Sequence, residues 1–384
     1  MKKVIYLDNA ATTRVRPEVV EAMLPYFTEH YGNPSSVYDF STPCKKAMAH
    51  TREVIAGSLG ASENEIYFTN GGTEADNWAL KAAAEAYASK GKHIITTQIE
   101  HHAVLHTGQY LEKLGYEVTY LPVDENGVVS VDALKKAVRP DTILISVMFA
   151  NNEIGTIEPI AEIGEIAKEH GILFHTDAVQ AYAHVPINVD ELGIDMLSSS
   201  GHKLNGPKGI GFIYINEKAK VKPIIFGGEQ QKNMRSGTEN VPGIAGIGLA
   251  AKTIYTDLDE KVAHMRALKQ HFIEGVQKID HTVIHGLYDE TSAPHIISVG
   301  FAGIRSEVLL HTLEEKGIYV SSGSACASNH PAISGVLKGI GAGKEYLDAT
   351  LRFSMSEFTT EEEIDYTLET LYNCVPMLRK YTRH

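Results

Sequence analysis

Long apolar runs are missing from this chain of 384 residues. No stretch approaches the roughly 18 consecutive apolar residues that a membrane-spanning helix requires, so no contact with a membrane is expected. The amino terminus also reaches an acid at Asp8, too early for the apolar core of a signal peptide. The sequence therefore predicts a cytoplasmic protein.

Cysteine and positive charge are scarce as well. The three cysteines are few, odd in number and far apart, which argues against a disulfide framework and suits a reducing compartment. A formal net charge of −13 disfavours direct binding to nucleic acid, because its phosphates would be repelled on average. What remains is a composition with 43% hydrophobic residues, enough for a substantial core, and a length that favours two domains.

Apolar strand patterns alternate with amphipathic helix patterns through the first part of the chain. We expect strands at 93–97, 117–121 and 142–148, with helices near 103–114 and 131–138. This rhythm predicts a mainly parallel sheet covered by helices.

One long helical stretch over 243–279 then predicts a bridge into a smaller C-terminal domain. We place the boundary near residue 260. The large domain spans 1–260, with an N-terminal segment that is able to pack against the small domain, and the small domain spans 261–384.

Lys203 follows small hydroxyl residues and His202, directly before a glycine-rich strand pattern at 209–215. A lysine becomes a nucleophile when burial or a neighbouring cation lowers its pKa, and it is then able to hold an aldehyde cofactor. A solvated lysine in a turn is the alternative for such a motif taken alone.

Two upstream features favour the cofactor. Asp177 ends a buried strand pattern at 171–177, where an acid can keep a pyridine nitrogen protonated, although a helix cap is the alternative role. Gly72 and Thr73 lie where a strand pattern gives way to a helix, an arrangement that directs free backbone N–H groups at an anion. A lysine, an acid and a phosphate site together predict pyridoxal phosphate.

Cys326 lies in a run of small and polar residues, 321–331, that offers little to pack against. The run favours an exposed, reactive thiol over the buried hydrophobe that a free cysteine usually is. Cys44 and Cys374 stand in helical patterns among apolar residues, and we expect both to be packing residues.

Ordered motifs spread over almost the whole chain resemble those of one family. They are Tyr6-Leu7-Asp8-Asn9-Ala10-Ala11-Thr12-Thr13, Gly32-Asn33-Pro34-Ser35-Ser36, Gly72-Thr73-Glu74-Ala75-Asp76-Asn77, Glu100-His101-His102-Ala103-Val104, Asn151-Asn152-Glu153-Ile154-Gly155, Asp177-Ala178-Val179-Gln180, the Lys203 motif, Arg235-Ser236-Gly237-Thr238, Ser321-Ser322-Gly323-Ser324-Ala325-Cys326 and Leu351-Arg352-Phe353-Ser354. The chain is similar to cysteine desulfurases of the NifS/IscS type, in the class V aminotransferase family of fold type I pyridoxal phosphate enzymes.

The resemblance implies an α/β fold of the aminotransferase type, with a mainly parallel sheet in the large domain and a smaller C-terminal α+β domain. It implies removal of sulfur from L-cysteine, giving L-alanine and a persulfide on Cys326. Lys203 would hold pyridoxal phosphate and then take the Cα proton. A homodimer is implied, with sulfur passed to an acceptor protein such as an iron–sulfur scaffold or a tRNA-thiolation enzyme.

Further site roles come from the same resemblance. His101 would stack on the cofactor ring and shuttle protons, Asp177 would face the ring nitrogen, and Gln180 would bind the phenolic oxygen of the ring. The substrate carboxylate would pair with Arg352, aided by the amide of Asn152. The phosphate would be held by Gly72, Thr73, Ser200 and His202, and by Thr238 from the neighbouring subunit.

Departures from the family pattern and two other function classes stay open. Tyr38 and Ser41 replace a usual histidine and glycine, which puts substrate access or dimer contacts in doubt. His102 replaces a lysine and forms an i, i+4 pair with His106 that could bind zinc, but no cysteine or carboxylate set stands near it, so we predict no resident metal. A related enzyme, such as an aminotransferase or selenocysteine lyase, and a non-catalytic metal-binding or scaffold protein are the alternatives.

Overall fold

Seven strands form the central sheet of the computed structural model, which describes residues 4–322 and 333–381. The strand order is β2-β8-β7-β6-β5-β3-β4, in which β8 runs antiparallel to both of its neighbours and the other pairs are parallel. The strands are β2 (Ile66–Thr69), β3 (His93–Thr97), β4 (Glu117–Leu121), β5 (Thr142–Ser146), β6 (Leu173–Asp177), β7 (Met196–Ser200) and β8 (Gly211–Ile215). The predicted mainly parallel sheet is confirmed.

Helices cover both faces of this sheet because its strands are apolar on both sides. In β5, Leu144 packs into the core beneath one set of helices and Ile145 into the core beneath the other, as alternate strand residues must. One face carries α4 (Gly72–Tyr87) and α5 (His102–Lys113), and the other carries α3 (Thr42–Leu59), α6 (Val131–Ala137), α7 (Ile160–His170) and α8 (Val241–Thr256).

Short elements complete this part of the chain. They are helices α1 (Pro17–Met23) and α2 (Pro25–Thr28) and the 3₁₀ turns η1 (Asp39–Ser41), η2 (Glu63–Glu65), η3 (Gly201–Lys203) and η4 (Gln230–Asn233). Among the described residues, no helix combines the length and the apolar character that crossing a membrane requires.

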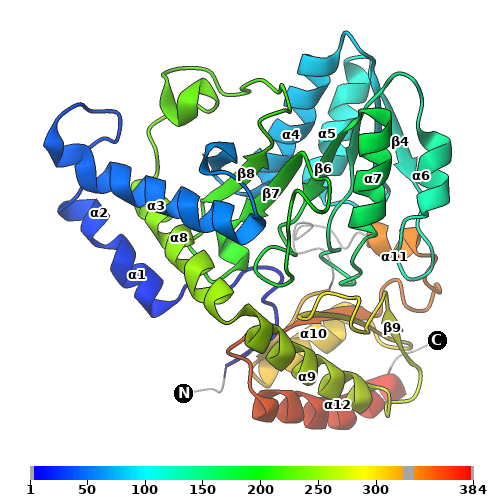
Figure 1. Ribbon diagram of the computed structural model, residues 1–384. Helices are drawn as coiled ribbons and strands as arrows, with labels where there is room; N and C mark the ends of the chain where they lie inside the picture. Colours follow the sequence, from blue (N-terminus) through cyan, green and yellow to red (C-terminus); the bar gives the residue numbers. More distant parts are fainter. Residues whose placement is uncertain (1–3, 323–332, 382–384) are drawn as a thin grey trace.

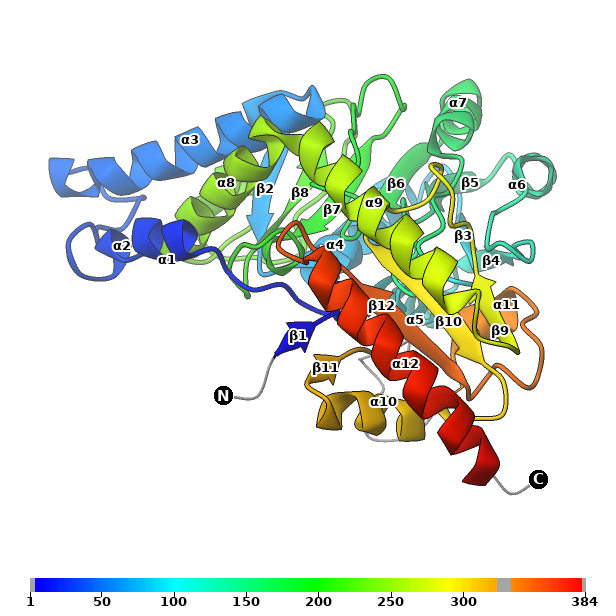
Figure 2. The same ribbon diagram turned by 90° about the horizontal axis from the view of Figure 1, so that it is seen from below.

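A second, smaller core lies beneath the central sheet in Figure 1 and belongs to the C-terminal part of the chain. Its antiparallel sheet has the order β12-β10-β9, and Figure 2 shows α9 and α12 lying across it. The N-terminal residues Ile5 and Leu7 are buried in this same core. The elements are β9 (Thr282–His285), β10 (Ile296–Phe301), β12 (Thr350–Ser354), the parallel pair β1 (Ile5–Tyr6) and β11 (Ile318–Tyr319), and helices α9 (Leu258–Val276), α10 (Ser306–Glu315), α11 (Gly335–Gly339) and α12 (Glu361–Tyr381).

The prediction of one continuous helix over 243–279 is wrong. The stretch contains two helices, α8 and α9, and the break falls at Asp257, whose φ of −134° and ψ of 40° are not helical. Aspartate favours helix ends over helix interiors, and Asp259 and Glu260 place two further acids in the first turn of α9, where the positive end of the helix dipole stabilises them. The division of the chain near residue 260 stays a prediction.

Candidate active site

One cavity of about 240 Å³ gathers most of the predicted site residues. Several of them stand at or just beyond the carboxyl ends of parallel strands: Asp177 ends β6, Ser200 ends β7, and His101 follows β3. The open edge of such a sheet is where α/β folds place ligands. The predicted residues that line the cavity are Gly72, Thr73, His101, Asn152, Asp177, Gln180, Ser200, His202, Lys203 and Arg352.

One predicted residue is not brought to this cavity. Thr238 is exposed and is not among the residues that line it, so its predicted role across a subunit boundary stays a prediction. Cys326 lies outside the described residues.

Cys44 and Cys374 are both buried in apolar clusters, and burial raises the pKa of the Cys374 thiol to about 11. Both therefore pack as expected and are poor nucleophiles at neutral pH.

Lys203 is held by the N-terminal segment of the chain. Its Nζ donates to the main-chain oxygen of Ala11 at 3.0 Å and also to that of Ala10. The adjacent His202 ring lies 3.2 Å from the Thr12 hydroxyl. Burial, reinforced by the charge of Lys203, lowers the pKa of His202 to about 4, so its ring is neutral at pH 7.

Two buried acids, Asp177 and Asp76, approach each other at the inner end of the cavity. A ligand atom of each and one of His101 all lie within 4.8 Å of one another. Asp76 is 1% exposed and its Oδ1 accepts no hydrogen bond, and burial followed by the charge of Asp177 raises the pKa of Asp76 well above its usual range. Burial raises the pKa of Asp177 as well, and a cationic ring nitrogen beside this carboxyl group would favour its ionised form.

The start of α4 is built to receive an anion. Gly71 has a φ of 144°, and a side chain on Gly72 would bring its Cβ within 2.6 Å of Val179 Cγ2. Glycine at these two positions lets the 16-residue helix α4 begin directly at the cavity, with Thr73 in its first turn. Backbone N–H groups at a helix start, together with the Ser200 hydroxyl, match the needs of a phosphate. The residues present therefore fit both the ring nitrogen and the phosphate of pyridoxal phosphate.

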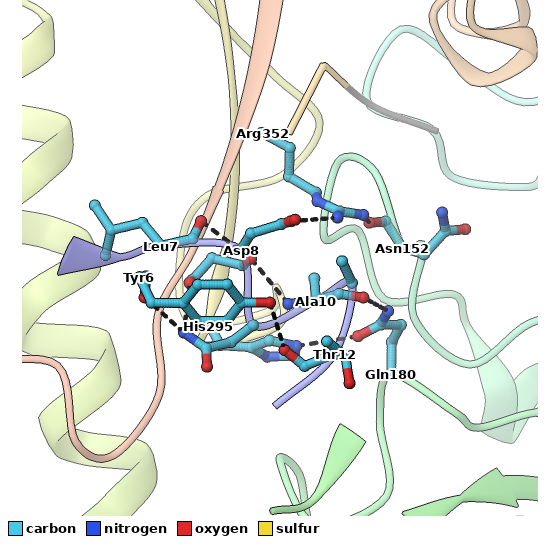
Figure 3. Close-up of polar contacts among 12 residues, drawn as sticks. Tyr6, Leu7, Asp8, Ala10, Thr12, Asn152, Gln180, His295 and Arg352 are labelled. Carbon is cyan, nitrogen blue, oxygen red and sulfur yellow. Dashed lines mark hydrogen bonds and ion pairs between the residues drawn. The ribbon is translucent and has the colours of Figure 1, made fainter. Parts of the chain in front are cut away.

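Arg352 closes the wall of the cavity from the small C-terminal sheet. It is 3% exposed, and its Nη1 donates to the main-chain oxygen of Asn152 at 2.7 Å, so the backbone and not the side-chain amide of Asn152 makes this contact. Its Nη2 pairs with Asp8 Oδ1 at 2.8 Å (Figure 3). The Nε group is buried and has no hydrogen-bond partner.

Gln180 is held between the N-terminal segment and the C-terminal sheet. Its Nε2 donates to the main-chain oxygen of Ala10 at 2.9 Å, and its Oε1 lies 3.3 Å from Nε2 of His295 (Figure 3). His295 in turn stacks on His184, with 3.8 Å between ring centroids. These contacts fix the direction of the Gln180 amide.

Sequence reasoning missed four acids at this site: Asp8, Asp76, Glu100 and Glu153. Glu100 Oε1 accepts hydrogen bonds from the Thr97 hydroxyl at 2.8 Å and from the Met148 N–H at 3.0 Å. Burial raises the pKa of Glu100 well above its usual range, and burial also raises the pKa of Glu153. All four stand inside the family-like motifs, and that position was the available signal.

The histidine pair considered for zinc lies at the edge of the cavity. His102 and His106 are both exposed, and their rings stack at 8° to each other with centroids 5.1 Å apart. Within the described ranges, no third metal-ligating side chain joins them in a compact cluster. The prediction of no resident metal stays a prediction.

Comparison with known proteins agrees with this geometry. Residues 5–367 match the model of the family described as Aminotransferase class-V. A cysteine desulfurase IscS from Methanosarcina thermophila is 53% identical over 98% of this chain and 93% of the relative. A solved NifS-like protein is 39% identical with a TM-score of 0.92, covering 98% of this chain and all of that one. SspA, solved in complex with cysteine, is 35% identical with a TM-score of 0.81, covering 93% of this chain and all of that one.

Proposed function

The chain belongs to the class-V aminotransferase family, and on that premise we propose that it is a cysteine desulfurase that uses pyridoxal phosphate to convert L-cysteine to L-alanine. The observation that carries the proposal is the cavity itself. It is lined by a lysine that could hold an aldehyde, Lys203, by an acid that could face a ring nitrogen, Asp177, and by a buried guanidinium that could bind a carboxylate, Arg352. An amino acid and a cofactor need these three groups together.

The cofactor would be held by residues that already surround the cavity. Asp177 would face the ring nitrogen, His101 would cover the ring, and Gln180 would donate to the phenolic oxygen. The phosphate would bind at the start of α4 with Ser200 and with the neutral ring of His202. When bound, pyridoxal phosphate supplies an electron sink that makes the Cα proton of an amino acid acidic.

The chain's own groups then carry out binding and proton transfer. Arg352 orients the substrate carboxylate, which directs the Cα–H bond toward the cofactor side of the cavity. The amine of Lys203 takes the Cα proton, and His101, which lines the same cavity, would move further protons.

Sulfur transfer is assigned to Cys326. Its thiolate attacks the substrate sulfur, so that a sulfur–sulfur bond forms while the carbon–sulfur bond breaks. The carbon skeleton takes up protons and leaves as L-alanine, and the sulfur stays on Cys326 as a persulfide. An acceptor protein, an iron–sulfur scaffold or a tRNA-thiolation enzyme, would then receive it in the cytoplasm. A homodimer in which Thr238 completes the neighbouring phosphate site belongs to the same proposal.

The test uses the holoenzyme and sulfur-labelled L-cysteine. Wild-type protein should release L-alanine and carry label on Cys326, and Cys326→Ser should bind the cofactor normally but release no L-alanine above background. Cys44→Ser is the matched control and should behave as wild type, since that thiol is buried far from this chemistry. Full L-alanine release by Cys326→Ser would instead support a lyase that needs no protein persulfide.

A further inference from the structure

Arg352 is not an open binding site for a carboxylate, because Asp8 already occupies one side of it. Asp8 Oδ1 lies 2.8 Å from Nη2, and the main-chain oxygen of Asn152 lies 2.7 Å from Nη1. Figure 3 shows the guanidinium group between these two partners. Arg352 lines the cavity, and because its Nε is buried, the remaining N–H groups of Nη1 and Nη2 are the ones left for a ligand.

The backbone around Asp8 is fixed to the strand that carries Arg352. Ser354, two residues beyond Arg352, donates its N–H to the oxygen of Leu7 at 2.7 Å and accepts at its main-chain oxygen from the side-chain amide of Asn9 at 3.0 Å. The main-chain oxygen of Asp8 accepts from the Ala11 N–H at 3.0 Å. Asp8 therefore stays beside Arg352 when the cavity fills.

The pair is poorly solvated. The Arg352 side chain is 4% exposed and that of Asp8 is 19% exposed. Charges in such surroundings are screened much less than charges in water, so Asp8 offsets the desolvation of Arg352 while the cavity is free of ligand. The same weak screening makes a second carboxylate next to Asp8 unfavourable.

We propose that Asp8 is the resident counter-ion of Arg352 and sets the affinity of the site for the α-carboxylate of its amino acids. The inference rests on the proposed function, in which that carboxylate binds Arg352. Asp8 acts on substrate and product alike, since both carry the same carboxylate. Its presence keeps L-alanine weakly bound and so favours product release, at the expense of a higher KM for L-cysteine.

The experiment compares wild-type holoenzyme with Asp8→Asn. Asparagine keeps an oxygen that accepts from Nη2 but removes the negative charge. The Kd of L-alanine, read from the visible spectrum of the cofactor, and the KM of L-cysteine should both fall about tenfold. Asp8→Ser, which removes the same charge with a smaller side chain, is measured alongside and should change both constants in the same direction.

A matched control and a second background isolate the charge effect. Glu357→Gln neutralises a similarly buried partner of another arginine, Arg16, outside the cavity, and should leave both constants unchanged. In an Arg352→Gln background, Asp8→Asn should still lower the Kd of L-alanine, because the charge of Asp8 repels the carboxylate whether or not a guanidinium stands beside it.

An unchanged or higher Kd of L-alanine in both Asp8 variants would overturn the proposal and leave Asp8 as a residue that only positions Arg352. Failure of the proposed function has a different signature. In that case, wild-type protein would not release L-alanine from L-cysteine, whereas the comparison of L-alanine affinities would still report on Asp8.

Discussion

Replacing Lys269 by methionine should make the protein more stable at pH 7 and less stable near pH 10. Lys269, in α9, is 2% exposed, and burial followed by the charge of Arg266 lowers its pKa from 10.5 to about 7. The unfolded chain therefore binds more protons than the folded chain between pH 7 and 10.5, so the free energy of unfolding rises with pH across this window. A difference of about 3.5 in pKa corresponds to about 5 kcal/mol that is lost at and below pH 7.

Methionine avoids this loss but gives up two hydrogen bonds. Nζ of Lys269 donates to the Ser292 hydroxyl at 2.7 Å and to the Ala293 oxygen at 2.8 Å. At about 1 kcal/mol each, with part of the 5 kcal/mol recovered by local relaxation, we expect the variant to gain about 2–3 kcal/mol at pH 7. Near pH 10 most of this loss of stability is gone, because the pH approaches the pKa of the lysine in the unfolded chain, and the variant should be about 1 kcal/mol less stable than wild type.

The assay is urea unfolding at several pH values between 6.5 and about 10. Subtracting the free energies of unfolding of the two proteins cancels the contribution of every other titrating group. Lys278→Met, which changes an exposed lysine just beyond the same helix, is the control. Its stability curve should not cross that of wild type. Parallel stability curves for wild type and Lys269→Met would refute the reasoning, because they would mean that Lys269 keeps its proton on folding.

Three further predictions concern the cavity. Lys203→Ala should lose the borohydride-reducible link to the cofactor and fall to background turnover; normal activity would move the attachment site elsewhere. Gly72→Ala should weaken cofactor binding at least about tenfold in equilibrium dialysis, because its Cβ would stand 2.6 Å from Val179 Cγ2, whereas Gly57→Ala, with nothing within 4 Å, should not. Arg352→Ala should raise the Kd of L-alanine about ten- to 150-fold with the cofactor still bound; an unchanged Kd would place the carboxylate site elsewhere.

Much of the fold could be predicted because it depends on short-range patterns. The strand at 93–97 and the helix at 131–137 are visible as apolar periodicity, and the turn at Gly71 and Gly72 is required by a strand that passes directly into a helix. The break at Asp257 was missed because both helices keep the same apolar spacing across it. Periodicity alone does not detect a single non-helical residue.

Some residues of the candidate site could likewise be predicted from the sequence, and others could not. The Lys203 and Asp177 positions were available from residue types at strand ends. The burial of Asp76 and the pairing of Asp8 with Arg352 were not, because both depend on segments far apart in the chain meeting in space. An acid is usually exposed, so composition gives no sign that four acids line one cavity. They are Asp76, Glu100, Glu153 and Asp177.

The N-terminal segment that holds Lys203 has a consequence for biosynthesis. Asp8 and Arg352 are 344 residues apart, and the Ala10 oxygen that accepts from Lys203 is made 193 residues before its partner. On the ribosome, the segment leaves the exit tunnel early and has no β12 to bind until the 344 residues from Asp8 to Arg352 have been made. The central sheet is able to form before that time, but the cavity wall is not. We therefore expect nascent chains that lack β12 to fold their larger core and yet retain little cofactor, so that cofactor capture follows the synthesis of β12.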